Sequence, residues 1–249
     1  MQISTFATEK HLRKCFSLPK KPETTTVVVN YPGGYQMRNV LILGASGKIA
    51  LLVEEMLHSR TDIHLTLYLR HLSKLPDKNQ AWGQVILGDV MDTKLLTQAM
   101  EHQDLVYANL AGENIFQQAQ NVVTAMQQQQ VRRLIWISTL GIYNEVPGNF
   151  GKWNNKMLGE SYLPNYKKAA ATIEASNLDY TIIRPAWLQD LDEVDYEITT
   201  KDEPFKGTEV SRKSVASLVT KIITQPQQYV QQSLGVNKPN TAGERPSWY

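Results

Sequence analysis

A glycine-containing turn lies between an apolar run and an amphipathic segment, and this arrangement constrains the fold more than any other feature. Residues 40–43 are continuously apolar, as in a strand that is covered on both faces. The turn at residues 44–47 (Gly-Ala-Ser-Gly) follows at once, and Gly44 tolerates the backbone angles of a tight reversal. Apolar residues then recur at helical spacing at positions 49, 52, 53, 56 and 57. The segment therefore predicts a strand, a tight turn and a helix in direct succession.

Strand-like and helix-like segments alternate through the rest of the chain. Further strands are predicted at residues 64–69, 85–87, 105–110, 134–137 and 180–183. Helices are predicted from apolar stripes at residues 95–100, 115–126, 166–173 and 215–223. Strands that alternate with helices of this length indicate βαβ units and a parallel sheet. We therefore predict one α/β domain with a doubly wound parallel sheet, the Rossmann architecture.

Residues 1–36 differ in composition from the sequence that follows them. They contain Lys20-Lys21-Pro22 and Pro32-Gly33-Gly34, and residues 24–29 are their only strand-like run. Met37, in contrast, leads directly into the first apolar run. We therefore predict a loosely attached N-terminal extension at residues 1–36 and a domain at residues 37–249. The alternative is a docked arm in which residues 25–29 pair with an edge of the sheet.

The turn has the features of a phosphate-binding loop. Gly47 would let the backbone approach a pyrophosphate, and the small Ala50 would let the helix pack closely on the strand. The start of the helix offers unpaired N–H groups and a positive dipole end to phosphate. We therefore predict a dinucleotide held by Gly44, Ser46, Gly47, Lys48 and Ile49. The alternative is a turn that uses glycine only for its geometry.

The end of the second predicted strand indicates which dinucleotide binds. NAD-binding domains place an Asp or Glu there, about 20 residues after the turn, on the ribose hydroxyls. Here the strand ends in Arg70 and His71, with Lys74 close behind and no acidic residue before Asp77. A guanidinium would pair with the 2′-phosphate of NADP. The position therefore favours NADP(H) over NAD(H), and the alternative is an ordinary basic surface loop.

These motifs together resemble the atypical short-chain dehydrogenase/reductases, in the NAD(P)-binding NmrA-like branch. The resemblance covers about residues 37–246, and its most specific segments are residues 44–47, 69–70, 88–90, 134–138, 177–185 and 210–216. It implies that Asp89 and Val90 contact the adenine and that Asn109, Leu110 and Ala111 lie near the cofactor ribose. It also implies that Ser138 faces the nicotinamide, with Pro185 and Ala186 near the carboxamide.

The chain departs from the catalytic pattern of that wider family, which uses a serine and a Tyr-x-x-x-Lys motif. Tyr162 falls near the tyrosine position, but Tyr166 stands where the lysine belongs. Lys167 is one residue out of phase, a rotation of about 100° on a helix, and would reach the cofactor only through a shifted loop. We predict Ser138 and Tyr162 as catalytic residues and Lys167 as a cofactor contact. The alternatives are a Ser138 hydroxyl satisfied by the backbone and a Tyr162 ring packed on Phe150 or Trp153.

Two segments after strand ends are candidates for the substrate side. The segment 143–165 is rich in glycine and aromatic residues, and the segment 190–197 is rich in Asp and Glu. Ligands bind at the carboxyl ends of strands in open α/β sheets, so we expect both segments to be loops that line a substrate pocket, with aromatic rings as a stacking wall. The acidic residues are predicted to be solvated and not to bind a cation.

Composition argues against several other classes of protein. The net charge of +2 and the pI near 8.5 give no electrostatic reason for a nucleic-acid partner. Cys15 is the only cysteine and the five histidines show no metal-ligand spacing, so neither a disulfide nor a metal site is predicted. The chain has neither an apolar leader nor a membrane-length apolar stretch, so we expect no membrane association and a cytoplasmic location.

The sequence supports two functions of different kinds. The first is an NADP(H)-dependent oxidoreductase whose small-molecule substrate is a carbonyl, quinone or flavin-like acceptor. The second, suggested by the missing Tyr-x-x-x-Lys, is a non-catalytic NADP(H) sensor that controls a partner protein. A weaker third possibility is a sugar-nucleotide enzyme or an isomerase, since the fold alone does not fix the chemistry.

Overall fold

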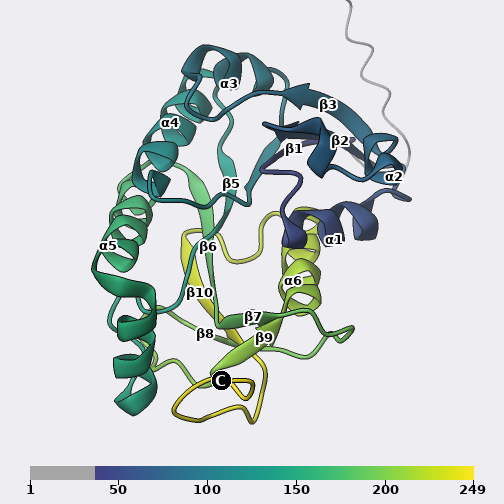
Figure 1. Cartoon of the computed structure of the whole chain (residues 1–249). Helices are drawn as coiled ribbons and strands as arrows, with labels where there is room; N and C mark the ends of the chain where they lie inside the picture. The colour runs from purple at the N-terminus through teal and green to yellow at the C-terminus, as the bar shows by residue number, and fades with distance from the viewer. Residues whose placement is uncertain (1–36) are drawn as a thin grey trace, which may run out of the picture. The chain divides into compact units, whose positions relative to one another are not determined.

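The computed structural model describes residues 37–249, which contain a mostly parallel sheet flanked by helices (Figure 1). The strand order is β3-β2-β1-β4-β5-β6-β10-β8, and only β8 runs antiparallel to its neighbour. The bounds are β1 (Arg38–Leu43), β2 (Ile63–Leu69), β3 (Gly83–Leu87), β4 (Leu105–Ala108), β5 (Arg133–Ile137), β6 (Asp179–Pro185), β8 (Glu197–Thr199) and β10 (Gln232–Asn237). The predicted doubly wound α/β fold is therefore confirmed.

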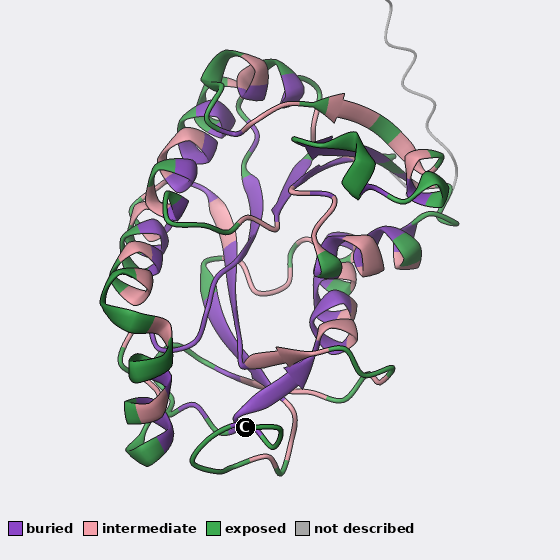
Figure 2. Cartoon of the chain, viewed as in Figure 1, coloured by how far each residue is buried: buried purple, intermediate pink, exposed green. Residues whose placement is uncertain are grey.

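Helices cover both faces of this sheet (Figure 1). One face packs against α1 (Lys48–Leu57) and α6 (Arg212–Thr224), and the other packs against α3 (Thr93–Ala99), α4 (Ile115–Gln128) and α5 (Gly148–Glu174). A short α2 (Asp77–Gln80) precedes β3. The central strands are buried over most of their length, as the purple ribbons of Figure 2 show. Burial on both faces explains why residues 40–43 and 134–137 read as unbroken apolar runs.

The ends of two helices follow from their sequences. Asp92 caps α3 by accepting a hydrogen bond from the Leu95 N–H. Ser211 caps α6 by accepting one from the Ser214 N–H at 2.9 Å. Such caps satisfy N–H groups that the first turn of a helix leaves without an internal partner.

The C-terminal part of the sheet was not predicted. Strand β10 has few apolar residues, but it pairs with β6 and β8 and is largely buried between them. A second, two-stranded sheet joins β7 (Trp187–Gln189) to β9 (Glu209–Ser211). Hydrogen bonding to neighbouring strands, and not local composition, determines these elements.

The expected loop at residues 143–165 is wrong for most of its length, because α5 begins at Gly148. The helix breaks at Gly159, whose φ of 72° lies in the left-handed region. Glycines and Pro164 lower the helix propensity here, yet Phe150 and Asn154 are buried and anchor the first half.

The predicted extension at residues 1–36, and the alternative of a docked arm, lie outside the described residues. Within the described residues, no helix is both long enough and apolar enough to cross a membrane.

Candidate functional site

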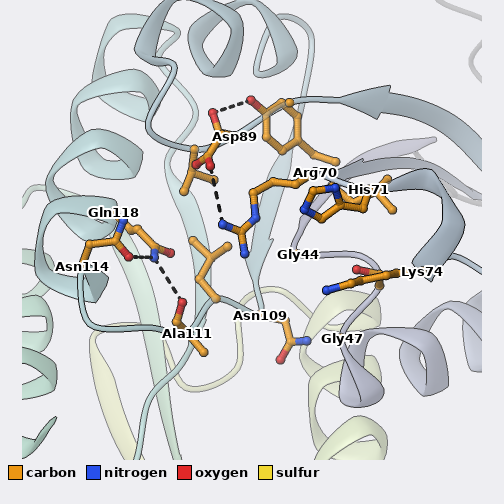
Figure 3. Close-up of a pocket in the computed structure, with 16 residues that line it drawn as sticks. Gly44, Gly47, Arg70, His71, Lys74, Asp89, Asn109, Ala111, Asn114 and Gln118 are labelled. Atoms are coloured by element: carbon orange, nitrogen blue, oxygen red, sulfur yellow. Dashed lines mark hydrogen bonds and ion pairs between the residues drawn. The ribbon is translucent and has the colours of Figure 1, made fainter.

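A hollow of about 290 Å³ lies at the carboxyl ends of β1, β2, β3 and β4 (Figure 3). It brings together most of the residues predicted to bind the dinucleotide. Those that line it are Gly44, Ser46, Gly47, Arg70, Asp89, Val90, Asn109 and Ala111, together with the basic residues His71 and Lys74. Because these residues come from the ends of four adjacent strands, the sheet itself fixes their relative positions.

The turn between β1 and α1 has the predicted conformation. Gly44 has a φ of 76°, and its N–H donates to the Tyr68 carbonyl at 2.9 Å. A Cβ on Gly47 would lie 2.1 Å from Asn109 Nδ2, so the space that this glycine leaves is taken by the Asn109 amide. The lack of a side chain at Gly47 therefore makes room for Asn109, in addition to letting a ligand approach the backbone.

The start of α1 is suited to an anionic group. Its N-cap, Gly47, supplies no side-chain hydrogen bond, and the first turn holds no acidic residue. The N–H groups of this turn are therefore left for a ligand, which is the arrangement that binds a pyrophosphate. The residues present fit a dinucleotide.

Two predicted residues do not face this hollow with their side chains. Lys48 Nζ pairs with Asp190 Oδ2 at 2.7 Å, and Ile49 is buried in the core beneath the sheet. Both belong to the first turn of α1, so their backbone N–H groups remain candidates for phosphate contact.

A basic group forms the β2 side of the hollow, as Figure 3 shows. Arg70 is well exposed and lies 3.7 Å from the Asp89 carboxylate, and His71 and Lys74 flank it. The acidic residue of this hollow therefore follows β3, and none follows β2. Exposed pairs of this kind are worth at most about 1 kcal/mol, so Arg70 can readily turn to a phosphate.

Three residues of the hollow lie outside the sequence motifs associated with the cofactor: Tyr68, Asn114 and Gln118. Burial raises the pKa of Tyr68 to about 12, and its hydroxyl donates to the Asp89 carbonyl at 2.9 Å. Gln118 Nε2 donates to Asn114 Oδ1 and to the Ala111 carbonyl, which holds the loop after β4 (Figure 3). The sequence feature that could have indicated Gln118 was the presence of a polar glutamine within the apolar stripe of α4.

A second hollow, of about 400 Å³, contains the two predicted catalytic residues and Pro185. Ser138 follows β5, and its N–H donates to the Ile183 carbonyl at 2.7 Å. Its Oγ is buried and makes no hydrogen bond to any described residue. The alternative of a hydroxyl satisfied by the backbone is therefore wrong, and this oxygen keeps its donor and acceptor capacity.

Tyr162 lines the same hollow but has an unexpected neighbour. Its ring stacks on Tyr166 with 4.4 Å between centroids, whereas Phe150 stacks on Trp153. Packing of Tyr162 on either of those two residues is thus not observed. Burial raises the pKa of Tyr162, against a smaller opposing effect of the hydrogen bond with Tyr166.

Lys167 lies apart from these residues. It is exposed and lines a separate hollow with Lys156, Glu160 and Pro164. The structure therefore does not bring Lys167 together with Ser138 and Tyr162, as its phase on the helix suggested.

The two hollows lie along one edge of the sheet. The first ends at β4 and the second begins at β5, which pairs directly with β4. Strands are about 4.8 Å apart, so β2 and β5 are separated by roughly 14 Å. A ligand that reached from Arg70 to Ser138 would have to be extended along this edge.

The acidic segment after β7 is paired with basic residues. Asp190 contacts Lys48 and Arg212, Asp192 contacts Lys213, and Glu193 contacts Lys238. Among the described residues, no group of His, Cys, Asp or Glu could hold a metal ion.

Known proteins resemble the chain over most of its length. The pattern of the NAD(P)H-binding family matches residues 44–226. A Rossmann-fold NAD(P)-binding family protein from Shigella flexneri is 45% identical, with 85% of this chain and 98% of that one covered and a TM-score of 0.75. A short-chain dehydrogenase/reductase from Veillonella parvula DSM 2008, solved in complex with NADP, is 30% identical, with 84% and 99% covered and a TM-score of 0.79.

A more distant structure shares the fold. ChuY, an anaerobillin reductase from Escherichia coli O157:H7, is 20% identical, with 82% of this chain and 99% of that one covered and a TM-score of 0.69. No curated protein matches the chain. The family pattern extends from the glycine turn through α6, so it includes every residue that lines the first hollow and all those of the second except Trp248 and Tyr249. The chain therefore belongs to the NAD(P)H-binding family of Rossmann-fold proteins.

Proposed function

We propose that the protein is an NADP(H)-dependent oxidoreductase of the atypical short-chain type, in the NmrA-like branch, that acts on a small carbonyl, quinone or flavin-like acceptor. The observation that carries this proposal is the buried, unpartnered hydroxyl of Ser138 at the wall of the second hollow. A buried polar group without a partner destabilises a protein, and a substrate oxygen would supply the missing partner. The nearby dinucleotide hollow supplies the cofactor side of the reaction.

The preference for NADP(H) rests on the basic group at the end of β2. Arg70, His71 and Lys74 line the hollow where an NAD-specific domain has a carboxylate. A 2′-phosphate there would form charge-assisted hydrogen bonds with a guanidinium. The NADP complex of the Veillonella parvula relative supports the same choice.

The chain's own residues would position the acceptor and manage one proton. Bound NADPH supplies a hydride to the acceptor. The Ser138 hydroxyl donates a hydrogen bond to the acceptor oxygen and polarises it. The Tyr162 phenol, kept protonated by its raised pKa, can then give a proton to the same oxygen and recover one from solvent.

The sensor alternative has one specific observation in its favour. The Tyr162 phenol is engaged with Tyr166, and Lys167 lies in another hollow, so no lysine lowers the phenol pKa as the Tyr-x-x-x-Lys arrangement would. A sensor would bind NADP⁺ and NADPH with different affinities, would not oxidise NADPH with any acceptor, and would act through a protein partner.

Calorimetric titration of NADPH, NADP⁺, NADH and NAD⁺ tests the cofactor assignment. Arg70→Ala should weaken NADPH binding at least tenfold and leave NADH binding nearly unchanged, and Arg132→Ala, an exposed arginine away from both hollows, is the matched control. An equal loss for both cofactors in Arg70→Ala would contradict the role of Arg70.

An acceptor screen then separates the enzyme from the sensor. We expect NADPH oxidation with at least one carbonyl, quinone or flavin, reduced at least tenfold in kcat by Ser138→Ala. Tight, redox-selective binding without turnover across the panel would establish the sensor instead.

We further propose that the protein works in the cytoplasm on a small-molecule substrate and that residues 1–36 are an extension outside the domain.

A further inference from the structure

The second hollow has an aromatic wall built from distant parts of the chain. Trp187 belongs to β7, Tyr162 to α5, and Trp248 and Tyr249 follow β10. The Trp187 indole is held by a 2.9 Å hydrogen bond from its Nε1 to Asn154 Oδ1 and packs edge-on against Tyr249, with 5.5 Å between centroids. Trp187 is thus fixed in place before any ligand arrives.

Trp248 and Tyr249 leave much of their surface open. They are 46% and 48% exposed, although both are large aromatic residues. Exposed aromatic rings at a hollow are suited to stacking on a flat ligand, because a ring supplies a large contact area at little cost in conformational freedom.

The same hollow has a single charged side chain among the described residues that line it, and this is Arg212. Its side chain is only 22% exposed. Nη1 donates to Asp190 Oδ1 at 2.7 Å, and the remaining N–H groups of the guanidinium have no partner among the described residues. A guanidinium offers a planar fork that matches a carboxylate, so part of this fork is left for a ligand.

Asp190 acts as a weak internal counter-ion for this arginine. Its carboxylate is 59% exposed and is shared with Lys48, 2.7 Å away on α1, which lies beside α6 (Figure 1). Exposed ion pairs contribute at most about 1 kcal/mol. An incoming carboxylate can therefore compete with Asp190 for Arg212 while Lys48 retains its partner.

We propose that the acceptor is a planar aromatic acid, with its ring system on Trp248 and Tyr249 and its carboxylate on Arg212. This inference rests on the proposed oxidoreductase function and names the class of its substrate. The Ser138 hydroxyl lines the same hollow and is left for the acceptor's reducible oxygen.

Binding of simple probes tests this proposal without turnover. We would titrate 2-naphthoate, its neutral isostere 2-naphthamide and the non-aromatic cyclohexanecarboxylate into the full-length protein, with and without saturating NADP⁺, by calorimetry. Wild type should bind 2-naphthoate at least tenfold more tightly than either of the other two. Arg212→Gln should abolish the preference for naphthoate over naphthamide, and Asp190→Asn should increase it. Trp248→Ala should reduce the preference for naphthoate over cyclohexanecarboxylate.

Lys213→Gln is the matched control, because Lys213 is the next cation on α6 but pairs with Asp192 and does not line the hollow. It should leave all three affinities unchanged. Equal binding of naphthoate and naphthamide in wild type, or equal losses in Lys213→Gln and Arg212→Gln, would overturn the proposal. Titration of NADPH into the same samples tests the proposed function separately. If NADPH did not bind, the proposed function would fail, but the comparison of the three probes in the absence of NADP⁺ would still test the aromatic-acid site.

Discussion

Glu54 is a buried carboxyl group on α1, and its replacement by glutamine should stabilise the protein near neutral pH. The side chain is fully buried, and Asn79 Nδ2 donates to its Oε2 at 2.7 Å. Glu54 Oε1, Asn79 Oδ1 and the Tyr107 hydroxyl have no partner among the described residues. A protonated carboxyl adds a donor among these oxygens, whereas a carboxylate adds only charge.

The magnitude follows from the pKa of Glu54. Burial raises it from its ordinary value of 4.5 to about 8, against a smaller lowering by the Asn79 hydrogen bond. Between these two values the folded protein retains a proton that the unfolded chain releases, so stability falls as the pH rises. At about 1.4 kcal/mol per pH unit, the loss is roughly 3 kcal/mol at pH 7 and under about 1 kcal/mol at pH 5. Glutamine mimics the protonated form and should remove this loss.

Urea unfolding of wild type and Glu54→Gln at pH 5, 6, 7 and 8 measures the effect. The free energy of unfolding of the variant should exceed that of wild type by about 3 kcal/mol at pH 7, and the difference should shrink towards pH 5. Glu55→Gln is the control, because Glu55 is an exposed neighbour whose one ion pair within residues 37–249 is with Lys78. If the difference between Glu54→Gln and wild type were the same at pH 5 and pH 8, the titration of Glu54 would not be its cause.

Three further substitutions test the site and its support. Gly47→Ala places a Cβ 2.1 Å from Asn109 Nδ2, so NADPH should bind at least tenfold more weakly by calorimetry; an unchanged affinity would contradict the tight turn. Glu145→Gln leaves the buried Arg184 guanidinium without its counter-charge, and urea unfolding should show a loss of about 3–5 kcal/mol, whereas a loss under about 1 kcal/mol would refute the pairing. Ser211→Ala removes the cap of α6 and should lower the thermally measured stability by about 1 kcal/mol; an unshifted midpoint would mean that the cap contributes nothing.

The first half of the fold could be predicted because its information is local. Strands that are buried on both faces need continuous apolar residues, and a turn with positive φ favours glycine, so residues 40–47 carry their own structure. Strand β10 (Gln-Ser-Leu-Gly-Val-Asn) lacks that signal. It is a strand because its backbone pairs with β6 on one side and β8 on the other. Such pairing depends on residues about 50 positions away, which local periodicity does not report.

Apart from Asn114 and Gln118 at the start of α4, the dinucleotide side of the site was likewise predictable, because its residues follow recognisable strands. The substrate side was not. Trp248 returns to the hollow from the far end of the chain, and Arg212 enters it only because β9 directs the start of α6 there. The role of Asp190 as a bridge between α1 and α6 was also hidden, since its partners lie 142 and 22 residues away.

The distribution of positive charge along the sheet edge bears on the missing lysine. In the Tyr-x-x-x-Lys arrangement a single ammonium both orients the ribose and lowers the phenol pKa. Here cations stand at the two ends, with Arg70 in the first hollow and Arg212 in the second, and Tyr162 lies beside Tyr166 instead. The phenol pKa is raised and not lowered, so proton donation from Tyr162 is intrinsically slow at neutral pH. Hydride transfer to an isolated ketone leaves a strongly basic alkoxide, whereas transfer to a quinone or a flavin leaves a weakly basic anion. A quinone or flavin therefore needs less help from such a phenol than a ketone needs. The charge pattern therefore favours the quinone and flavin-like acceptors over the simple carbonyls within the proposed function.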